Sequence, residues 1–360
     1  MENPNLYIGK TLGERYQIIN IIGYGGMSVV YGAYDMKSGE PCALKMFDDS
    51  SCEDEESKKE AKRRFLNEIA TMSKLSHPNI VNIKDVSKDG EPLYLVMEYI
   101  EANTLKLRIN DCGALPPEEI LDYAEQILRA LIHTHKHGIV HCDIKPHNMM
   151  LLANGQIKLT DFGIARFVNS EENVESDTAI GTAYYISPEQ ASGKKIDQRS
   201  DIYSLGVMMY EMATGRLPFM ASDTSTVSKM HIENKPTRPG VFNQELPTGL
   251  EQIILRAMEK TPFMRFKDAE EMLSDVLSLH NNLNTVFDYN RVTPDYENID
   301  ENDNGTKGWV FALMGVAAAF ILSLVVTIVA LIVINSSKDT VRFTAPYEQG
   351  ALIWNEVADE

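Results

Sequence analysis

The sequence predicts an α+β fold in which an antiparallel β-sheet with one helix is followed by a mainly helical part and then a single transmembrane helix. Three observations predict this arrangement. Short β-rich segments separated by turn residues occupy residues 14–47. Helical spacing of apolar residues dominates after residue 117. Residues 309–334 contain no charged residue.

The first elements are expected to be strands. The segments RYQIINIIG, VVYGAYD and PCALKMF have β-prone compositions, and a Lys-Ser-Gly-Glu turn separates the last two. The charged run from 48 to 60 is interpreted as a solvated loop that leads into a helix, in which Phe65, Ile69 and Met72 share one face. A further strand is expected in LYLVMEYI, which ends at Ile100.

The middle of the chain is predicted to be mostly helical. Pro117 suits a helix start, and an apolar face follows at Leu121, Ala124, Leu128 and Leu131. Helices are expected in ILDYAEQILRALIHTH, DIYSLGVMMYEMATG, GLEQIILRAME and FKDAEEMLSDVLSLH. The second is apolar nearly all round, which predicts a buried helix.

The last quarter of the chain indicates a membrane anchor. Residues 284–308 form an acidic linker with six acidic and two basic residues. The 26 uncharged residues at 309–334 would reach about 39 Å as a helix, enough to cross a bilayer core of about 30 Å. A buried core helix is the alternative, but such helices are rarely this long. Residues 335–360 would form a short tail on the far side.

Composition limits the function and the compartment. With 34 Lys and Arg against 52 Asp and Glu, the net charge of −18 argues against a nucleic-acid partner. The four cysteines show no paired spacing, which is typical of reduced thiols. The N-terminus has no apolar run behind a basic start, so the large N-terminal part is expected to stay in the cytoplasm.

A glycine-rich segment lies between the first two expected strands. Glycines lack a Cβ and let the backbone approach phosphate groups, and a valine after them can cover a flat base. By itself the pattern also fits a hairpin turn, and no helix follows it, which argues against a dinucleotide-binding turn. The candidate nucleotide-binding residues are Ile22, Gly23, Tyr24, Gly25, Gly26, Met27, Ser28, Val29 and Val30.

Lys45 lies in an otherwise apolar strand, where an inward-pointing ammonium needs an anionic partner. Glu68 is the best candidate, because it sits next to the apolar face of the Phe65 helix. Two solvent-facing charges are the alternative.

The sequence HCDIKPHN at 141–148, followed by DFG at 161–163, contains the groups that phosphoryl transfer requires. Asp143 could accept a hydroxyl proton and Lys145 could neutralise the transferring group. Asn148 and Asp161 could hold Mg²⁺.

This ordered set resembles a protein kinase, and specifically the transmembrane eukaryotic-like serine/threonine kinases of bacteria. The resemblance covers residues 16–280 and implies a two-lobed kinase domain at 1–283, with an N-lobe at about 14–100 and a C-lobe at about 101–283. It also implies that Gly23, Gly25 and Gly26 cover ATP, that Lys45 paired with Glu68 holds its phosphates, and that Asp143 is the catalytic base. Lys145 resembles the lysine that marks serine/threonine kinases.

The resemblance implies further roles. Met97 would lie behind the adenine, the backbone from Glu98 to Ile100 would bind it, and Val30, Ala43 and Met150 would enclose it. Glu189 is expected to pair with Arg265, and Asp201 to anchor the catalytic-loop backbone.

Two positions depart from the family pattern. Ser28 replaces a third glycine, where the backbone need not approach the phosphates as closely. Cys142 replaces the arginine that normally binds a phosphate on the activation segment, so activation through that contact is in doubt. Ser176 and Thr178 are the candidate autophosphorylation sites, and acidic neighbours suggest partly constitutive activity.

Two other interpretations of this region remain open. Oxidation of Cys142 could block the site, although the adjacent carboxylate should raise the pKa of the thiol. A metal site could form from a cluster of imidazoles and one thiol, but its spacing crosses a helix end and a loop. Its members are His133, His135, His137, His141, Cys142 and His147.

The expected function is therefore transfer of the γ-phosphoryl group of ATP to Ser or Thr hydroxyls of proteins, including the kinase itself, with Mg²⁺ or Mn²⁺. The alternative is a nucleotide-binding pseudokinase that serves as a membrane scaffold. A single-pass protein of the cell membrane is expected, with the kinase domain in the cytoplasm and the tail outside. A homodimer through the span or the N-lobe is also expected to be possible, and the small residues at 315–319 would allow helix packing in the span.

Overall fold

The computed structural model of the 360-residue chain describes residues 4–25, 27–50, 52, 54–88, 92–162, 166–167 and 183–289. All of them belong to one compact unit, Met1–Val292. The second unit, Thr293–Glu360, lies outside the described residues, and so does the expected span at 309–334. Within the described residues, no helix combines the length and apolar character that crossing a bilayer would need.

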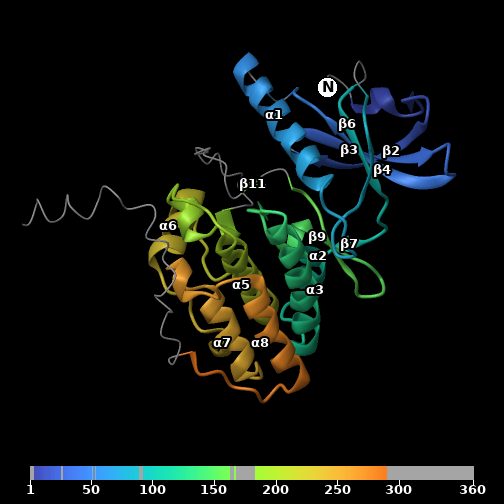
Figure 1. The fold of residues 1–360 in the computed structure, drawn as a ribbon. Helices are drawn as coiled ribbons and strands as arrows, with labels where there is room; N and C mark the ends of the chain where they lie inside the picture. Colours follow the sequence, from blue (N-terminus) through green and yellow to red (C-terminus); the bar gives the residue numbers. More distant parts are fainter. Residues whose placement is uncertain are drawn as a thin grey trace, which may run out of the picture. The chain divides into compact units, whose positions relative to one another are not determined.

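The first hundred residues form a six-stranded antiparallel sheet with the order β1-β2-β3-β4-β6-β5 (Figure 1). A short 3-10 helix, η1, precedes it at Pro4–Tyr7. The strands are β1 (Thr11–Leu12), β2 (Tyr16–Gly25), β3 (Ser28–Asp35), β4 (Glu40–Phe47), β5 (Ile83–Val86) and β6 (Tyr94–Glu98). The three strand segments expected at the start of the sequence are therefore confirmed as β2, β3 and β4.

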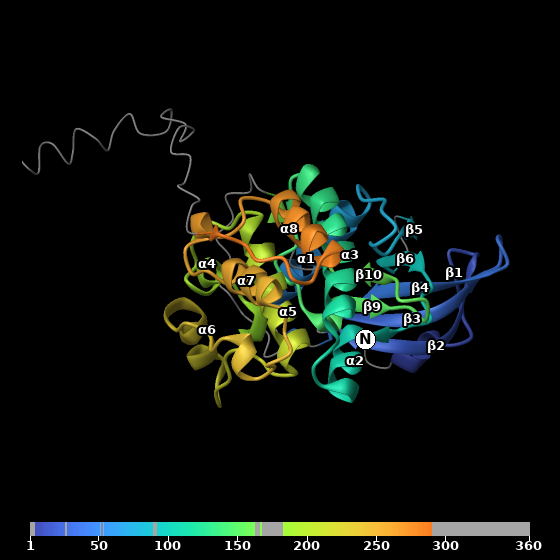
Figure 2. The ribbon, with the colours of Figure 1, turned by 90° about the horizontal axis from the view of Figure 1, so that it is seen from below.

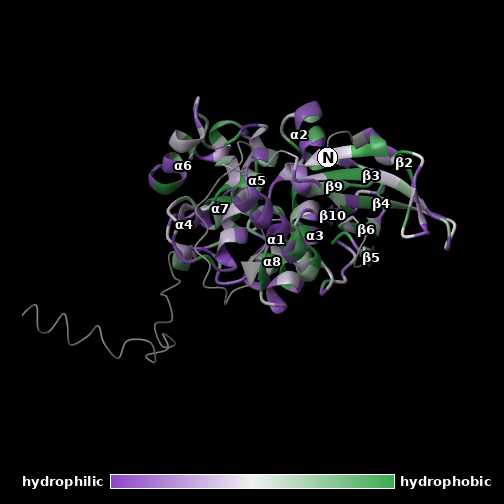
Figure 3. Ribbon diagram, turned by 90° about the horizontal axis from the view of Figure 1, so that it is seen from above, coloured by the Kyte–Doolittle hydropathy of each residue, from purple (hydrophilic) through white to green (hydrophobic). Residues whose placement is uncertain are grey.

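Alternation along the strands gives the sheet two different faces. Cross-strand partners share a face, and Val30 pairs with Lys45 while Ala43 pairs with Met97. These four residues therefore share the face that also carries the site described below. The opposite face forms a separate small core made of Leu12, Tyr16, Ile18, Val29, Tyr31, Ala33, Cys42, Leu44, Met46, Tyr94 and Val96. In Figure 3 β3 is largely green, which marks its apolar residues.

Helix α1 (Glu55–Met72) packs beside this sheet (Figure 1). It begins earlier than the sequence suggested, because residues 55–60 were expected to belong to a loop. Asp54 caps the helix by accepting a hydrogen bond from the Ser57 backbone N–H at 2.7 Å. The charged residues then form the exposed surface of the helix, because ion pairs at helical spacing, such as Glu60 with Arg64, stabilise it.

The remainder is mainly helical, and its long helices pack around a buried α5. The helices are α2 (Leu105–Cys112), α3 (Pro117–Lys136), α4 (Pro188–Ala191), α5 (Arg199–Thr214), α6 (Thr224–Glu233), α7 (Thr248–Ala257) and α8 (Ala269–Asn281). Helix α8 lies beside α3 (Figure 2), and α5 contacts both α3 and α7. Every residue of α5 from Ser200 to Thr214 is buried, which confirms the buried helix predicted from its composition.

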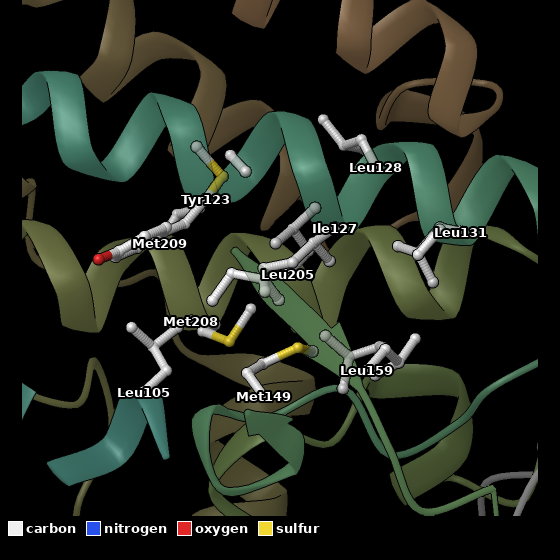
Figure 4. Close-up of a cluster of buried hydrophobic side chains, with 14 of the residues drawn as sticks. Leu105, Tyr123, Ile127, Leu128, Leu131, Met149, Leu159, Leu205, Met208 and Met209 are labelled. Carbon is white, nitrogen blue, oxygen red and sulfur yellow. The ribbon is translucent and has the colours of Figure 1, made fainter. Parts of the chain in front are cut away.

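The core of this part joins the helices to the short strands that present the site. Those strands are β7 (Asn103–Thr104), β8 (Ile139–Val140), β9 (Met149–Leu151), β10 (Ile157–Leu159) and β11 (Arg166–Phe167). Short 3-10 turns complete the lobe: η2 (Pro146–Asn148), η3 (Ala183–Tyr185), η4 (Pro239–Val241) and η5 (Pro262–Met264). In Figure 4, Ile127 of α3 and Leu205 of α5 lie together with Met149 and Leu159 of the strands. The strands are therefore supported directly by the helical core.

The segment after α1 is bonded to β10. The Leu159 N–H donates to the Asn79 carbonyl and the Val81 N–H donates to the Leu159 carbonyl, both at 2.9 Å. The Asn79 side chain also donates to the Ile157 carbonyl at 2.9 Å. The C-terminal end of α1 is thereby fixed to the helical lobe.

Packing continues beyond residue 283, the expected end of the kinase domain. The Gln252 side chain of α7 exchanges two 2.8 Å hydrogen bonds with the backbone of Phe287. Tyr289 donates to Asp275 at 2.7 Å, and the guanidinium of Arg256 lies 4.5 Å from its ring centre. Residues 284–289, expected to open the acidic linker, thus belong to the packed lobe.

Candidate active site

Three charged side chains from three separate elements meet at the site. Lys45 of β4 donates to Glu68 of α1 at 2.6 Å and to Asp161, which follows β10, at 2.9 Å. Lys45 and Glu68 are largely buried, whereas the Asp161 side chain is 49% exposed. The ammonium therefore joins the sheet, α1 and the helical lobe.

Electrostatics keep this ammonium charged. Burial lowers the pKa of Lys45, but the charges of Asp161 and Glu68 outweigh burial and raise it above its usual value. For Asp161, burial is opposed by the charge and hydrogen bond of Lys45, so the pKa of its carboxyl is lowered. Lys45 is thus cationic and Asp161 anionic at neutral pH.

The glycine-rich segment forms the hairpin between β2 and β3. Gly23 pairs with Val30 and Gly25 pairs with Ser28, while Gly26 lies outside the described residues. A Cβ on Gly25 would lie 2.8 Å from the Ser28 hydroxyl, so a side chain there would displace Ser28. Of the remaining residues of this segment, Ser28 and Val29 are buried, Met27 is half-buried and Ile22 and Tyr24 are exposed.

The candidate adenine-binding residues come from both lobes. Ala43 and Met97 are buried on the Lys45 face of the sheet, and half-buried Val30 packs against the same cluster. Met150 lies on β9 and is half-buried, as is Ile100 after β6.

Glu98 has a further contact that the sequence did not predict. Its backbone N–H donates to the Asn82 carbonyl at 3.0 Å. Its carboxylate accepts from Lys158 of β10 at 2.6 Å. This ion pair joins the end of the first sheet to the helical lobe, and no local signal in the sequence connects residues 60 positions apart.

The catalytic-loop candidates converge on the carboxylate of Asp143. Lys145 donates to Oδ2 of Asp143 at 2.7 Å, and the side-chain amide of Asn148 donates to the same oxygen at 3.0 Å and to the Asp143 carbonyl at 2.9 Å. The Thr160 N–H donates to the Asn148 carbonyl at 3.0 Å. This bond holds Asp161, the next residue, beside the loop.

Asp201 at the start of α5 binds the backbone of the catalytic loop. It is fully buried and accepts from the backbone N–H groups of His141 at 2.9 Å and Cys142 at 2.8 Å. His135 of α3 lies 2.8 Å from the same carboxylate. The sequence pattern suggests this histidine only as a member of a metal cluster.

Cys142 occupies a strained backbone position with φ of 66°. Its side chain is buried, and the thiol donates to the Val140 carbonyl at 3.6 Å. The thiol therefore lies against the interior of the lobe.

The oxygen donors of Asn148 and Asp161 suit a hard divalent cation. The amide nitrogen of Asn148 faces Asp143, which leaves its Oδ1 for a ligand, and the half-exposed carboxylate of Asp161 can accept a hydrated ion. In the described part of the chain, no three His, Cys, Asp or Glu side chains gather so that they could hold a metal ion. The histidine cluster considered from the sequence is dispersed: His133 contacts His137, while the ring of His141 packs on Phe162.

The segment after residue 183 is tied to the catalytic loop. Ser187 and Gln190 form a capping box at the start of α4, and the Gln190 amide donates to the Cys142 carbonyl at 2.8 Å. Glu189 accepts two 2.8 Å bonds from Arg265. Gln190 is not among the residues predicted from the sequence, although the Ser-x-x-Gln spacing indicates a capping box.

A buried carboxylate that the sequence does not predict lies beside the segment at 183–190. Glu211 of α5 is buried and accepts from Lys106 of α2 and from the Tyr185 hydroxyl. It fixes Tyr185, two residues before the capping box. The candidate phosphorylation sites Ser176 and Thr178 lie outside the described residues.

Comparison with known proteins agrees with this geometry. A family model described as a protein kinase domain matches residues 16–279. A probable serine/threonine-protein kinase of Clostridium acetobutylicum is 40% identical over 301 residues, which are 83% of this chain and 45% of that protein. Serine/threonine-protein kinase PrkC of Bacillus subtilis is 39% identical over 302 residues, 84% of this chain and 45% of PrkC.

A third relative is serine/threonine-protein kinase PknB of Mycobacterium tuberculosis, 36% identical over 276 residues. These residues are 75% of this chain and 44% of PknB. The chain therefore spans less than half of the length of these relatives.

Proposed function

Because the chain belongs to the protein kinase family, we propose that it transfers the γ-phosphoryl group of ATP to Ser and Thr hydroxyls of proteins. One observation carries the proposal: the Lys45–Glu68–Asp161 triad and the Asp143–Lys145–Asn148 group are joined through the Thr160–Asn148 bond. The names of the relatives support Ser and Thr as acceptors.

Each group has a distinct part in the transfer. Lys45, held by Glu68, binds the α- and β-phosphates. Asp143 accepts the proton of the acceptor hydroxyl. The oxygen of that hydroxyl bonds to the γ-phosphorus while the bond from the γ-phosphorus to the β-phosphate oxygen breaks, so that ADP leaves. Lys145, 2.7 Å from Asp143, stabilises the charge on the moving group.

Asn148 and Asp161 would hold Mg²⁺, or Mn²⁺ in its place. When bound there, such an ion would supply positive charge that neutralises the phosphate oxygens.

The test uses the 360-residue chain in detergent with radiolabelled ATP, Mg²⁺ and dephosphorylated casein. Asp143→Asn should lower the transfer rate by at least about 100-fold, because the general base is lost. Asp122→Asn on the exposed surface of α3 is the matched control and should keep the rate. Acid hydrolysis of the product should yield phosphoserine and phosphothreonine.

The same experiment separates the enzyme from a pseudokinase scaffold. Nucleotide binding without transfer in the unmodified chain would favour the scaffold. Lys45→Met should abolish transfer, whereas Lys136→Met, which removes an exposed lysine, should have no effect.

We further propose that the protein is anchored in the cell membrane by one span at 309–334, as the 26 uncharged residues suggest. ATP and protein acceptors then require the kinase domain on the cytoplasmic side and the tail outside. A homodimer through the span or the N-lobe would allow phosphorylation in trans.

Protease added to intact spheroplasts tests this orientation. It should remove an epitope placed after residue 360 and leave the kinase domain intact, and lysis should expose both to cleavage. Loss of the kinase domain before lysis would reverse the orientation, and survival of both would argue against a span.

We also propose partly constitutive activity. Cys142 replaces the arginine that would bind an activation-segment phosphate, and Glu171, Glu172, Glu175 and Asp177 already supply negative charge around Ser176 and Thr178. A Ser176→Ala/Thr178→Ala variant should therefore keep a measurable rate on casein. Complete loss of that rate would show that phosphorylation of the segment is required.

A further inference from the structure

A buried polar cluster between α5, α6 and the segment after α7 takes no part in the chemistry described above. His231 of α6 is fully buried, and Tyr203 of α5 is fully buried beside it. Lys260, after α7, places its ammonium 4.6 Å from the ring centre of Phe219 and 3.1 Å from the Tyr203 hydroxyl. Such groups are costly to bury unless each is satisfied.

The chemistry of the partners fixes the direction of every hydrogen bond in this cluster. An ammonium can only donate, so Lys260 donates to the Tyr203 hydroxyl at 3.1 Å and to the His231 carbonyl at 2.7 Å. Nε2 of His231 lies 3.1 Å from the Tyr184 carbonyl, which can only accept. Nε2 therefore carries a proton, and Tyr203 donates to Nδ1 at 2.9 Å.

Electrostatics keep this arrangement in place at neutral pH. Burial and the charge of Lys260 lower the pKa of His231 to about 3, so the ring stays neutral. Burial and the charge of Arg265 lower the pKa of Lys260 to about 8, which still leaves most of the ammonium charged. The chain of bonds therefore runs one way, from Lys260 through Tyr203 and His231 to Tyr184.

The relay ends in the loop at 183–190, which is bonded to the backbone of Cys142, the residue before Asp143. Tyr184 lies in the 3-10 turn η3, Ala183–Tyr185, and the next carbonyl, of Tyr185, accepts from Ser204 at 2.7 Å. Gln190 at the other end of the loop binds the Cys142 carbonyl. The Gln190 bond places the loop at 183–190 next to Asp143, the residue after Cys142 and the proposed base for the acceptor hydroxyl.

From this arrangement we propose that His231 is a positioning residue for the protein acceptor: it fixes the Tyr184 carbonyl, and Lys260 and Tyr203 fix His231. The relay thereby sets how the loop at 183–190 receives the acceptor, and it leaves ATP binding untouched. The inference rests on the proposed kinase function.

Two substitutions of His231 separate positioning from general packing. The amide nitrogen of Gln in His231→Gln can replace Nε2 and donate to Tyr184, whereas the shorter amide of Asn in His231→Asn replaces only Nδ1. With casein as acceptor and the 360-residue chain, His231→Asn should raise the KM for casein about tenfold, as expected for one lost buried hydrogen bond. His231→Gln keeps the bond to Tyr184 but loses the acceptor for Tyr203, so it should raise the KM for casein only about threefold, and the KM for ATP should be unchanged in both variants.

Tyr203→Phe provides a second variant that retains the ring. It removes the central hydroxyl of the relay and should raise the KM for casein about threefold. Tyr210→Phe is the matched control, because it removes a hydroxyl from a buried tyrosine of the same helix outside the relay, and it should leave both KM values unchanged.

The outcomes distinguish the two proposals. No transfer by the unmodified chain would contradict the kinase function itself. If the unmodified chain transfers phosphate but the KM for casein is unchanged in Tyr203→Phe and in folded His231→Asn, the positioning role of His231 is contradicted and the kinase function is not. Equal increases for casein and ATP would indicate general damage and also overturn that positioning role. If His231→Asn does not fold, Tyr203→Phe decides.

Discussion

Arg265 is fully buried, and each of its five N–H groups has an acceptor. Two bonds go to the carboxylate of Glu189, and the others go to the carbonyls of Glu259, Arg199 and Lys260. Burial alone would raise the pKa of Glu189, but the hydrogen bonds and charge of Arg265 outweigh it and lower the pKa. Arg265 thus joins α4 to the start of α5 and to the segment after α7.

Replacing Arg265 by Met should therefore be severe. The variant leaves a buried carboxylate without its cation, which costs about 3–5 kcal/mol of the free energy of unfolding at pH 7. Urea denaturation of the 360-residue chain measures the loss. Arg129→Met, which breaks a half-exposed pair with Glu125 on α3, should change stability by less than about 0.5 kcal/mol.

The same variant should respond to pH. The native pKa of Glu189 lies below its usual 4.5, so its pairing stabilises the fold above that pH and is lost as pH falls through the lowered value. In Arg265→Met burial is no longer opposed by the guanidinium and raises the pKa of Glu189, so the carboxyl can protonate as pH falls. The difference in the free energy of unfolding between the variant and the unmodified chain should therefore narrow in acid. A difference in the free energy of unfolding that does not change with pH would show that Glu189 is not the source of the instability.

His231 predicts a second pH effect, of defined sign. Its pKa falls from 6.5 to about 3 on folding, so acid favours the unfolded chain and stability declines as pH drops below 6.5. Between pH 7 and pH 5 the loss from this group is about 2 kcal/mol. His231→Gln cannot titrate, so its denaturation midpoint should fall less than that of the unmodified chain over this range.

At the scale of elements, contact between α5 and α7 depends on one glycine. A Cβ on Gly206 would lie 2.7 Å from the Cβ of Ala257 and 3.1 Å from Met258. Both atoms belong to packed parts of the fold, so the clash cannot be relieved by a flexible side-chain end. The glycine sets how closely the two helices approach.

Gly206→Ala should accordingly lower the free energy of unfolding by about 1–3 kcal/mol, despite the better helix propensity of alanine. Adding Ala257→Gly removes the opposing methyl group. A double-mutant cycle by urea denaturation should then show that the two changes together cost less than the sum of the single ones. Additive effects would place the strain elsewhere.

Local sequence signals predicted most elements but not all of their limits. Periodicity identified the strands β2 to β4, the buried α5 and the long α3, because their burial is reflected in composition. It failed at the start of α1, where a charged run forms an exposed helix after the Asp54 cap. Helices α2 and α6 were not predicted, since α6 buries only Val227 and His231 and has a weak apolar pattern.

The candidate site could be predicted from the sequence only in part. An ammonium within an apolar strand requires a partner, and this argument led from Lys45 to Glu68. The contacts of Glu98 with Lys158 and of His231 with Tyr184 span 60 and 47 positions. Only folding brings such residues together, so no local pattern could identify them.

On the scale of the whole molecule, the packed region includes residues that the sequence assigned to a linker. A chain ended after residue 283 would lack Phe287 and Tyr289, which contact α7 and α8. Losing their half-buried aromatic surface and hydrogen bonds should cost about 2–3 kcal/mol. Urea denaturation should give a lower midpoint for residues 1–283 than for residues 1–290, and equal midpoints would contradict the packing.

The bonds that fix the end of α1 give the helix the mechanics of a lever. For a rotation with Met72, which precedes the segment bonded to Leu159, as the pivot, the far end of the helix at Glu55 lies about 26 Å away. A swing of about 10° would move that end by about 4–5 Å but Glu68, only about 6 Å from the pivot, by about 1 Å. A partner pushing on the exposed tip would therefore work with a mechanical advantage of about four, so a weak push at Glu55 becomes a strong but short displacement at the contact with Lys45.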